Sequence, residues 1–330
     1  MGPPTEAPEK AKPLTSTSLA ATDAGVSELP EGLPEKLRRY GTAKARNRQM
    51  AGHLVLEGYR KLSERLYDCG SLLHFRHYLA HQQTRLIRTN SCDVSLLCPL
   101  CAIRRGAKQL RRYLERCEIL APAHDFELVT LTVKNGPDLA ERFQHLLSSW
   151  KRLNERAKKG YGAFADASGA FMSIEFTKTA AGWHPHVHMI WAMPKGTPPL
   201  RWGENSPLGI DWKAATGDSY IVHAERIGEH GADGKRSAGA TGSPNPLTSA
   251  LCEVLKYAVK FGDLDLADNL HAYRVLKGKR LTRAYGCFFG LEVPEKLDDD
   301  ELDGPYIDLF YRYTSGGYLA VPLHGHTLAH

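Results

Sequence analysis

Three histidines at alternate positions are the residues of this sequence whose types and spacing most directly suggest chemistry. His184, His186 and His188 lie within residues 183–191, where apolar residues alternate with others as is typical of a β-strand. Side chains two apart on a strand share a face, roughly 6–7 Å apart at Cα, so two imidazoles could share a divalent ion. Pro185 favours the start of a strand, which sets His184 apart. Alternating histidines also occur on ordinary polar strand faces, so this spacing alone does not establish a metal site.

A carboxylate on a neighbouring strand could complete such a site. Residues 170–177 are mostly apolar around Glu175, and residues 180–182 (Ala-Ala-Gly) predict a turn before the histidines. An antiparallel hairpin of the two strands would bring Glu175 near His186 and His188. We therefore predict Glu175, His186 and His188 as the metal ligands, with His184 as the alternative third ligand.

Four of the seven cysteines have the spacing C-x22-C-x5-C-x2-C; they are Cys69, Cys92, Cys98 and Cys101. A C-x2-C knuckle brings two thiolates to one ion, and structural zinc favours four ligands in closed tetrahedral coordination. We therefore predict a structural Zn²⁺ on these four residues. A chance C-x2-C beside buried free thiols is the simpler alternative, and three histidines could replace Cys69 as a ligand: His74, His77 and His81.

A dense basic segment follows the last of these cysteines. Its charges fall on a predicted helix with Leu110, Tyr113 and Leu114 on its apolar side. A basic helix anchored by a zinc knuckle suits contact with DNA phosphates, although a solvated helix face has the same composition. The predicted DNA-binding residues are Arg104, Arg105, Lys108, Arg111 and Arg112.

The composition limits the class of protein. The chain has 330 residues, 42% of them hydrophobic, which suffices for one large domain or two smaller ones. No window approaches roughly 20 uninterrupted apolar residues and the N-terminus lacks a signal segment, so we expect a cytoplasmic protein with no membrane partner. An odd number of cysteines without an export signal favours reduced thiols. The net charge of +6 permits a polyanionic partner without identifying one.

The sequence divides into four expected segments. Residues 1–42 are rich in Pro, Ala, Glu, Ser and Thr and are expected to be disordered. Residues 43–120 are expected to form a helical, zinc-binding and basic module, with helices up to residue 86. Residues 121–294 would form the domain that carries the histidines, and residues 295–330 a peripheral segment. Within the third segment we predict strands at 126–135, 170–177, 183–191, 219–226 and 285–291, helices at 139–159, 246–261 and 264–277, and loops at 194–218 and 228–246.

Three stretches, taken together and in order, resemble the motifs of one family. Residues 131–135 (LTVKN), 182–188 (GWHPHVH) and 253–260 (EVLKYAVK) resemble the first, the metal-binding second and the tyrosine-bearing third motif of plasmid rolling-circle replication initiators (Rep) of the HUH endonuclease superfamily. The upstream cysteines are similar to those of one branch with a single catalytic tyrosine. The resemblance implies an α+β fold with a central antiparallel β-sheet flanked by helices, preceded here by the zinc-bound helical module. Residues 121–294 would then be the HUH catalytic domain.

The resemblance also implies a reaction. Tyr257 would cleave one DNA strand at a replication origin through a 5′-phosphotyrosine intermediate, assisted by a divalent metal, Mn²⁺ or Mg²⁺. Glu253 lies four residues earlier, on the same face of the predicted helix, and could act as general base when the DNA is released. Lys260 could steady phosphate or phenolate charge. Without the motif, Tyr257 would be interpreted as a packed helix tyrosine and Glu253 as a partner of Lys256.

Our first interpretation is a site- and strand-specific DNA endonuclease and strand transferase that nicks a plasmid double-strand origin to initiate and terminate rolling-circle replication. Its partners would be origin DNA, single-stranded or extruded as a hairpin, and a host helicase with the replication machinery. A conjugative relaxase or single-tyrosine transposase is the alternative within the superfamily. A non-catalytic zinc-containing DNA-binding regulator, whose histidines complete a structural site, is the alternative from another class.

Overall fold

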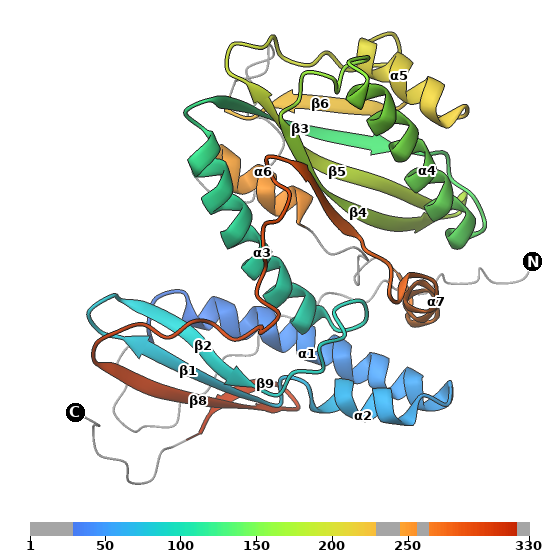
Figure 1. Ribbon diagram of the computed structural model, residues 1–330. Coiled ribbons are helices and arrows are strands. Elements are labelled where there is room, and N and C mark those ends of the chain that lie inside the picture. Colours follow the sequence, from blue (N-terminus) through green and yellow to red (C-terminus); the bar gives the residue numbers. More distant parts are fainter. Residues whose placement is uncertain (1–28, 229–244, 256–263, 322–330) are drawn as a thin grey trace, which may run out of the picture.

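The protein is an α+β fold with two antiparallel sheets, each in its own lobe, joined by one long helix (Figure 1). The computed structural model describes residues 29–228, 245–255 and 264–321. The predicted fold class, an antiparallel sheet flanked by helices, is confirmed. None of the helices in these ranges combines the length and the apolar composition that a membrane span requires.

The larger sheet has the strand order β6-β3-β5-β4-β7, and every neighbouring pair is antiparallel. Its strands are β3 (His124–Thr132), β4 (Gly169–Thr179), β5 (Gly182–Pro194), β6 (Val222–Arg226) and β7 (Thr282–Gly286). β4 and β5 form the predicted hairpin. Its tight turn requires Gly182, which has φ +102° and lies so close to Gly136 that a Cβ would meet the carbonyl oxygen at 2.4 Å.

The two faces of this sheet are covered differently. On one face, alternate strand residues such as Val129, Met172 and Val187 pack against α4 (Leu139–Lys158) and α5 (Pro207–Thr216). On the other face, the apolar residues Leu128, Phe171 and Ile190 pack against the end of α3 (Pro99–Leu120) and against α6 (Pro246–Val254). Among the described residues, this second cover reaches one end of the sheet, and the other end of the same face carries the polar side chains Glu175, His186 and His188. α7 (Leu266–Leu276) packs between the two lobes, because its residues contribute to both cores.

The smaller lobe contains α1 (Leu33–Leu56), α2 (Arg60–Asp68) and a four-stranded sheet of order β2-β1-β8-β9. Its strands are β1 (Leu72–Tyr78), β2 (Gln83–Thr89), β8 (Tyr306–Thr314) and β9 (Gly317–Ala320). The prediction of helices up to residue 86 is therefore wrong beyond Asp68. Leu73 and Phe75 are fully buried at alternate positions, which is the strand period.

Two expected segment boundaries also differ from the structure. α1 begins at Leu33, and its buried Leu33 and Tyr40 belong to the core, so residues 33–42 are helical; residues 1–28 lie outside the described ranges. The C-terminal segment is not peripheral, because β8 pairs with β1 along its length and Tyr311 and Tyr318 are buried in the small-lobe core. Strands from opposite ends of the chain thus complete one sheet.

Candidate functional site

The register of the β4–β5 hairpin brings a carboxylate and two imidazoles together on the polar end of the larger sheet. Glu175 pairs with His186, and Ser173 pairs with His188. Directly paired residues of antiparallel strands present their side chains on the same face. Glu175 therefore lies beside both histidines, as the predicted hairpin requires.

The three side chains converge on one point. Oε2 of Glu175 lies 3.2 Å from Nε2 of His186 and 3.1 Å from Nε2 of His188. All three residues are buried, with 2%, 8% and 9% of their surfaces exposed. Within the described ranges, they form one of two groups whose ligand atoms lie within 4.8 Å of one another and could hold a metal ion.

Hydrogen bonds behind the rings set their orientation. Nδ1 of His186 lies 3.3 Å from the carbonyl oxygen of His184, which can only accept, so a proton on Nδ1 would make this hydrogen bond and leave Nε2 as the nitrogen that faces Glu175 and could bind a metal. Nδ1 of His188 lies 3.0 Å from the Thr130 hydroxyl. An imidazole lone pair and a carboxylate oxygen this close repel each other unless a proton or a cation lies between them. The donor set therefore fits a divalent ion and leaves coordination positions for substrate and water.

His184, the alternative ligand, lies beside this group but is not part of it. Its ring centroid is 5.5 Å from that of His186. Burial, and to a lesser degree the charge of His186, lowers the pKa of His184. Its backbone carbonyl orients His186, a role that no side-chain pattern could predict.

The helix that precedes the predicted nucleophile lies on the same face of the sheet. Leu251 and Val254 of α6 pack against Phe171 and Ile190, which share a face with Glu175 and His188 because they lie an even number of residues away. Glu253 is half-buried in the last turn of α6. Leu255 is its C-cap. Tyr257 and Lys260 lie outside the described residues.

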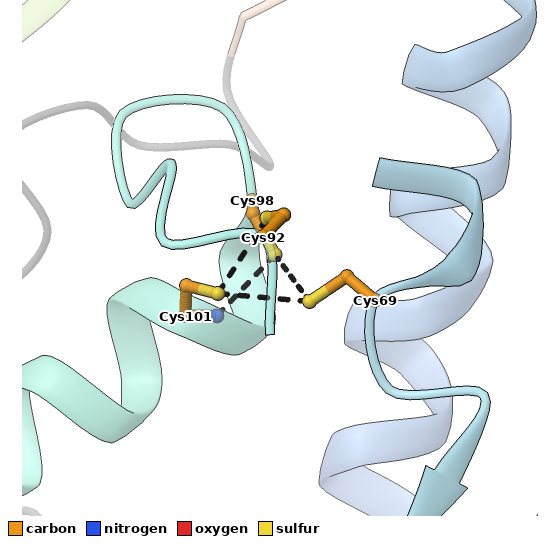
Figure 2. A group of neighbouring side chains, drawn as sticks. All are labelled: Cys69, Cys92, Cys98 and Cys101. Carbon is orange, nitrogen blue, oxygen red and sulfur yellow. Dashed lines mark hydrogen bonds between the residues drawn. The ribbon is translucent and has the colours of Figure 1, made fainter. Parts of the chain in front are cut away.

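The four predicted zinc ligands also come together (Figure 2). Cys69 follows α2, Cys92 lies after β2, and Cys98 caps α3, with Cys101 in the first turn of that helix. Sγ of Cys101 lies 3.6 Å from Sγ of both Cys69 and Cys92, and Cys69 lies 3.6 Å from Cys98. Four sulfurs at Zn–S distances of about 2.3 Å in a tetrahedron stand about 3.8 Å apart, so the cluster has the size of a zinc site.

The thiols also have the electrostatics of a cation site. Hydrogen bonds from the three other cysteines hold the pKa of Cys101 well below its ordinary value, whereas burial raises the pKa of Cys98. A zinc ion would allow all four to ionise, because its charge lies between them.

Helix α1 supplies two polar partners that the sequence did not identify. Nδ2 of Asn47 donates to Sγ of Cys98 at 2.9 Å, and the buried Nζ of Lys44 donates to the carbonyl oxygens of Tyr67 and Cys69. Burial lowers the pKa of Lys44, and the Cys69 thiol partly offsets that effect. N–H donors and a nearby ammonium counter the negative charge of a four-thiolate site. In the sequence, the only sign of these two partners is that Lys44 and Asn47 lie three residues apart on a predicted helix, and therefore on the same face.

The position after Cys69 requires glycine for a steric reason. Gly70 has φ +72°, and a Cβ on it would lie 2.8 Å from Cδ1 of Leu100. The Tyr318 hydroxyl of β9 donates to the Gly70 carbonyl at 2.6 Å. The C-terminal strand therefore braces the turn that presents the first zinc ligand.

Comparison with known families gives a match over most of the chain. The family profile described as "Replication protein" matches residues 83–309, more than half of the chain. The chain belongs to this family. No curated protein and no solved structure matches it.

The Replication protein family comprises initiators of plasmid rolling-circle replication, which implies that this member binds origin DNA. The match runs from β2 into β8 and contains Glu175, His186 and His188, together with three of the four clustered cysteines. Cys69 precedes the matched region.

In this Replication protein family member, an acidic segment after β7 covers part of the basic face of α3. Arg104 is 4% exposed and its guanidinium lies 2.6 Å from Asp298. Lys108 is 5% exposed and lies 3.6 Å from Asp300, which is also 3.4 Å from Arg111. Of the predicted DNA-binding residues, Arg105 is half-buried, whereas Arg111 and Arg112 are exposed.

Proposed function

We propose that this protein is the site- and strand-specific endonuclease and strand transferase that nicks a plasmid double-strand origin through a 5′-phosphotyrosine. The observation that carries the proposal is the convergence of Glu175, His186 and His188 on one face of the sheet. Membership of the Replication protein family supports the substrate, origin DNA. The packing of α6 on the same face supports Tyr257 as the nucleophile, because the chain leaves α6 on that side.

Different residues of the chain would bind the metal, attack the phosphate and orient the ligands. Glu175, His186 and His188 would hold a divalent ion such as Mn²⁺ or Mg²⁺, which when bound withdraws charge from the scissile phosphate. The phenolic oxygen of Tyr257 would attack phosphorus, the bond to the 3′ oxygen would break, and a free 3′-hydroxyl would leave. Thr130 and the His184 carbonyl would keep the two rings aimed at the ion. The covalent bond to tyrosine conserves the energy needed for rejoining.

The same proposal divides the chain by role. The zinc module, with its basic helix α3, would bind the origin DNA, and the site on the larger sheet would cleave it. Of the five predicted α3 cations, Arg105 and Arg112 are the better placed for phosphate contact, because Asp298 binds Arg104 and Asp300 lies beside both Lys108 and Arg111.

The first test concerns the nucleophile. Purified protein incubated with Mn²⁺ and labelled single-stranded origin DNA is expected to form a covalent protein–DNA adduct, and Tyr257→Phe is expected to form none, since the ring without its hydroxyl cannot attack. Tyr161→Phe is the matched control, because Tyr161 is 65% exposed and lies beyond α4. An adduct formed by Tyr257→Phe would exclude this nucleophile, and absence of any adduct with the native chain would favour a non-catalytic regulator.

The second test concerns Glu253. Glu253→Ala is expected to nick normally but to release DNA roughly 10²- to 10⁴-fold more slowly, because the water or 3′-hydroxyl that resolves the adduct loses its general base. The measurement is the lifetime of the adduct after a pulse of labelled DNA, with Glu253→Gln tested in parallel to separate proton transfer from packing. Normal turnover in both variants would remove Glu253 from the mechanism.

A further inference from the structure

The face that carries the metal ligands continues across two more strands of the sheet. His188 pairs with Thr130 on β3, and Thr130 pairs in turn with His223 on β6. These three side chains share one face, and His223 lies two strand spacings, roughly 10 Å, from His188. The proposed scissile phosphate and His223 therefore lie on one continuous surface.

A tryptophan lies against this outer histidine. The ring centroids of Trp202 and His223 are 4.8 Å apart, with the rings tilted by 44°. Trp202 is 59% exposed, whereas the other four tryptophans, Trp150, Trp183, Trp191 and Trp212, are at most 3% exposed. An indole with most of its surface in water next to an active-site face offers a ring face on which a planar ligand can stack.

The loop that presents Trp202 is anchored on both sides. Its Thr197 carbonyl accepts a hydrogen bond from the Arg226 guanidinium at 2.8 Å, and its Leu200 side chain packs on the main core. Arg226 is itself held by the buried Glu127 at 2.9 Å. The loop then enters α5, whose N-cap is Ser206. Trp202 is therefore held in place against β6 before any ligand arrives.

The surroundings of Trp202 point to the chemistry of the ligand. Ile221, two residues before His223, is 65% exposed. Its carbonyl accepts a hydrogen bond from the backbone amide of Thr132, which pairs with His186 across β3 and β5. Arg201 is exposed next to Trp202. A flat exposed aromatic ring with a cation next to it in the sequence suits an unpaired base and its phosphate, because every base has a face that can stack.

We propose that Trp202, backed by His223, forms a stacking subsite for an unpaired DNA base that flanks the scissile phosphate. The proposal rests on the proposed function, since it takes the nicked strand as the occupant. Continuity with the metal face favours single-stranded DNA over a protein partner. Stacking in this position would fix the register of the strand relative to Glu175, His186 and His188 and would hold the strand unpaired during cleavage.

The test measures binding without cleavage, in zinc-loaded protein with no added Mn²⁺ or Mg²⁺. The probes are an oligothymidylate and an oligomer of the same length built of abasic nucleotides, which keeps the phosphates and lacks the bases. Trp202→Ala is expected to weaken oligothymidylate binding roughly 5- to 150-fold and to leave the abasic oligomer unaffected. Trp202→Phe should recover part of the loss, and Tyr161→Ala, the exposed-aromatic control, should change neither affinity.

The intrinsic fluorescence provides a second readout that does not depend on a variant. Because Trp202 is the one tryptophan exposed by more than 3%, stacking of a base on it should quench part of the native emission, and this change should be absent in Trp202→Ala. Equal oligothymidylate affinity of Trp202→Ala and native protein, or equal quenching in both, would overturn the subsite. The covalent-adduct assay with Tyr257→Phe reports separately on the nicking reaction, so failure of one proposal is distinguishable from failure of the other.

Discussion

Replacement of Cys98 and Cys101 by serine is expected to remove the bound zinc and to unfold the smaller lobe. The four cysteine side chains sit inside its core, at most 1% exposed, beside Leu100 and Leu73. A structural zinc contributes about 10–16 kcal/mol of apparent binding free energy, which is as large as the whole stability of an ordinary domain, about 5–15 kcal/mol. Loss of two ligands therefore exceeds what the remaining core can offset.

The measurement is zinc content together with thermal unfolding. We expect about one zinc per chain in the native protein, from one four-cysteine cluster, and none in the double variant. Limited proteolysis should then cut within α1, α2 or the small sheet before it cuts the larger sheet. Cys252→Ser is the matched control, because this half-buried thiol lies in α6, outside the cluster, and the variant should keep its zinc. A double variant that retains zinc and its melting temperature would show that the cluster is not the zinc site.

The site was more predictable than the chain around it, for a physical reason. The hairpin places Glu175 opposite His186 through pairing between residues only 11 positions apart, and local alternation with a turn signal is enough to specify it. The C-x2-C knuckle is equally local. Both motifs could therefore be assigned before any long-range contact was known.

The pairing of β1 with β8 could not be predicted because it joins strands from opposite ends of the chain, whereas the local β1–β2 hairpin was concealed by apolar spacing that suggested a helix. His74 of β1 meets Asp308 of β8 across 234 positions, and no local pattern reveals such a partner. The same holds for the acidic segment, where Asp298 binds Arg104 from 194 positions away. Charge runs that look like separate solvated surfaces along the sequence are neutralised against each other in the fold.

α5 was missed although its signals are local. The Pro- and Gly-rich composition of region 194–218 predicts a loop, yet Ser206 accepts from the Gly209 amide as an N-cap and Pro207 occupies the first turn. Gly217, with φ +79°, ends the helix. The same Pro and Gly that suggest a loop by composition mark the two ends of a helix by position.

Glu175 is the residue whose loss should affect nicking most after the nucleophile itself. Its Oε2 is shared by both imidazoles, so Glu175→Ala removes one of three ligands and the negative charge that balances the ion. We expect adduct formation to slow by roughly three orders of magnitude, as the loss of several kcal/mol of metal-assisted stabilisation implies. Glu175→Gln should be nearly as slow, because the amide keeps the shape and loses the charge.

The dependence on Mn²⁺ distinguishes a Glu175→Ala protein that is slow because it binds the ion weakly from one that is slow for another reason. If Glu175 mainly holds the ion, high Mn²⁺ should restore much of the rate of adduct formation in Glu175→Ala, because His186 and His188 remain hydrogen-bonded in place through the His184 carbonyl and Thr130. Glu155→Gln is the control for loss of a carboxylate, since Glu155 is exposed on α4 and pairs only with Lys151 at 3.7 Å among its described contacts. A Glu175→Ala protein that forms the adduct at the native rate in low Mn²⁺ would mean that the convergence of these three side chains serves the fold and not the cleavage of DNA.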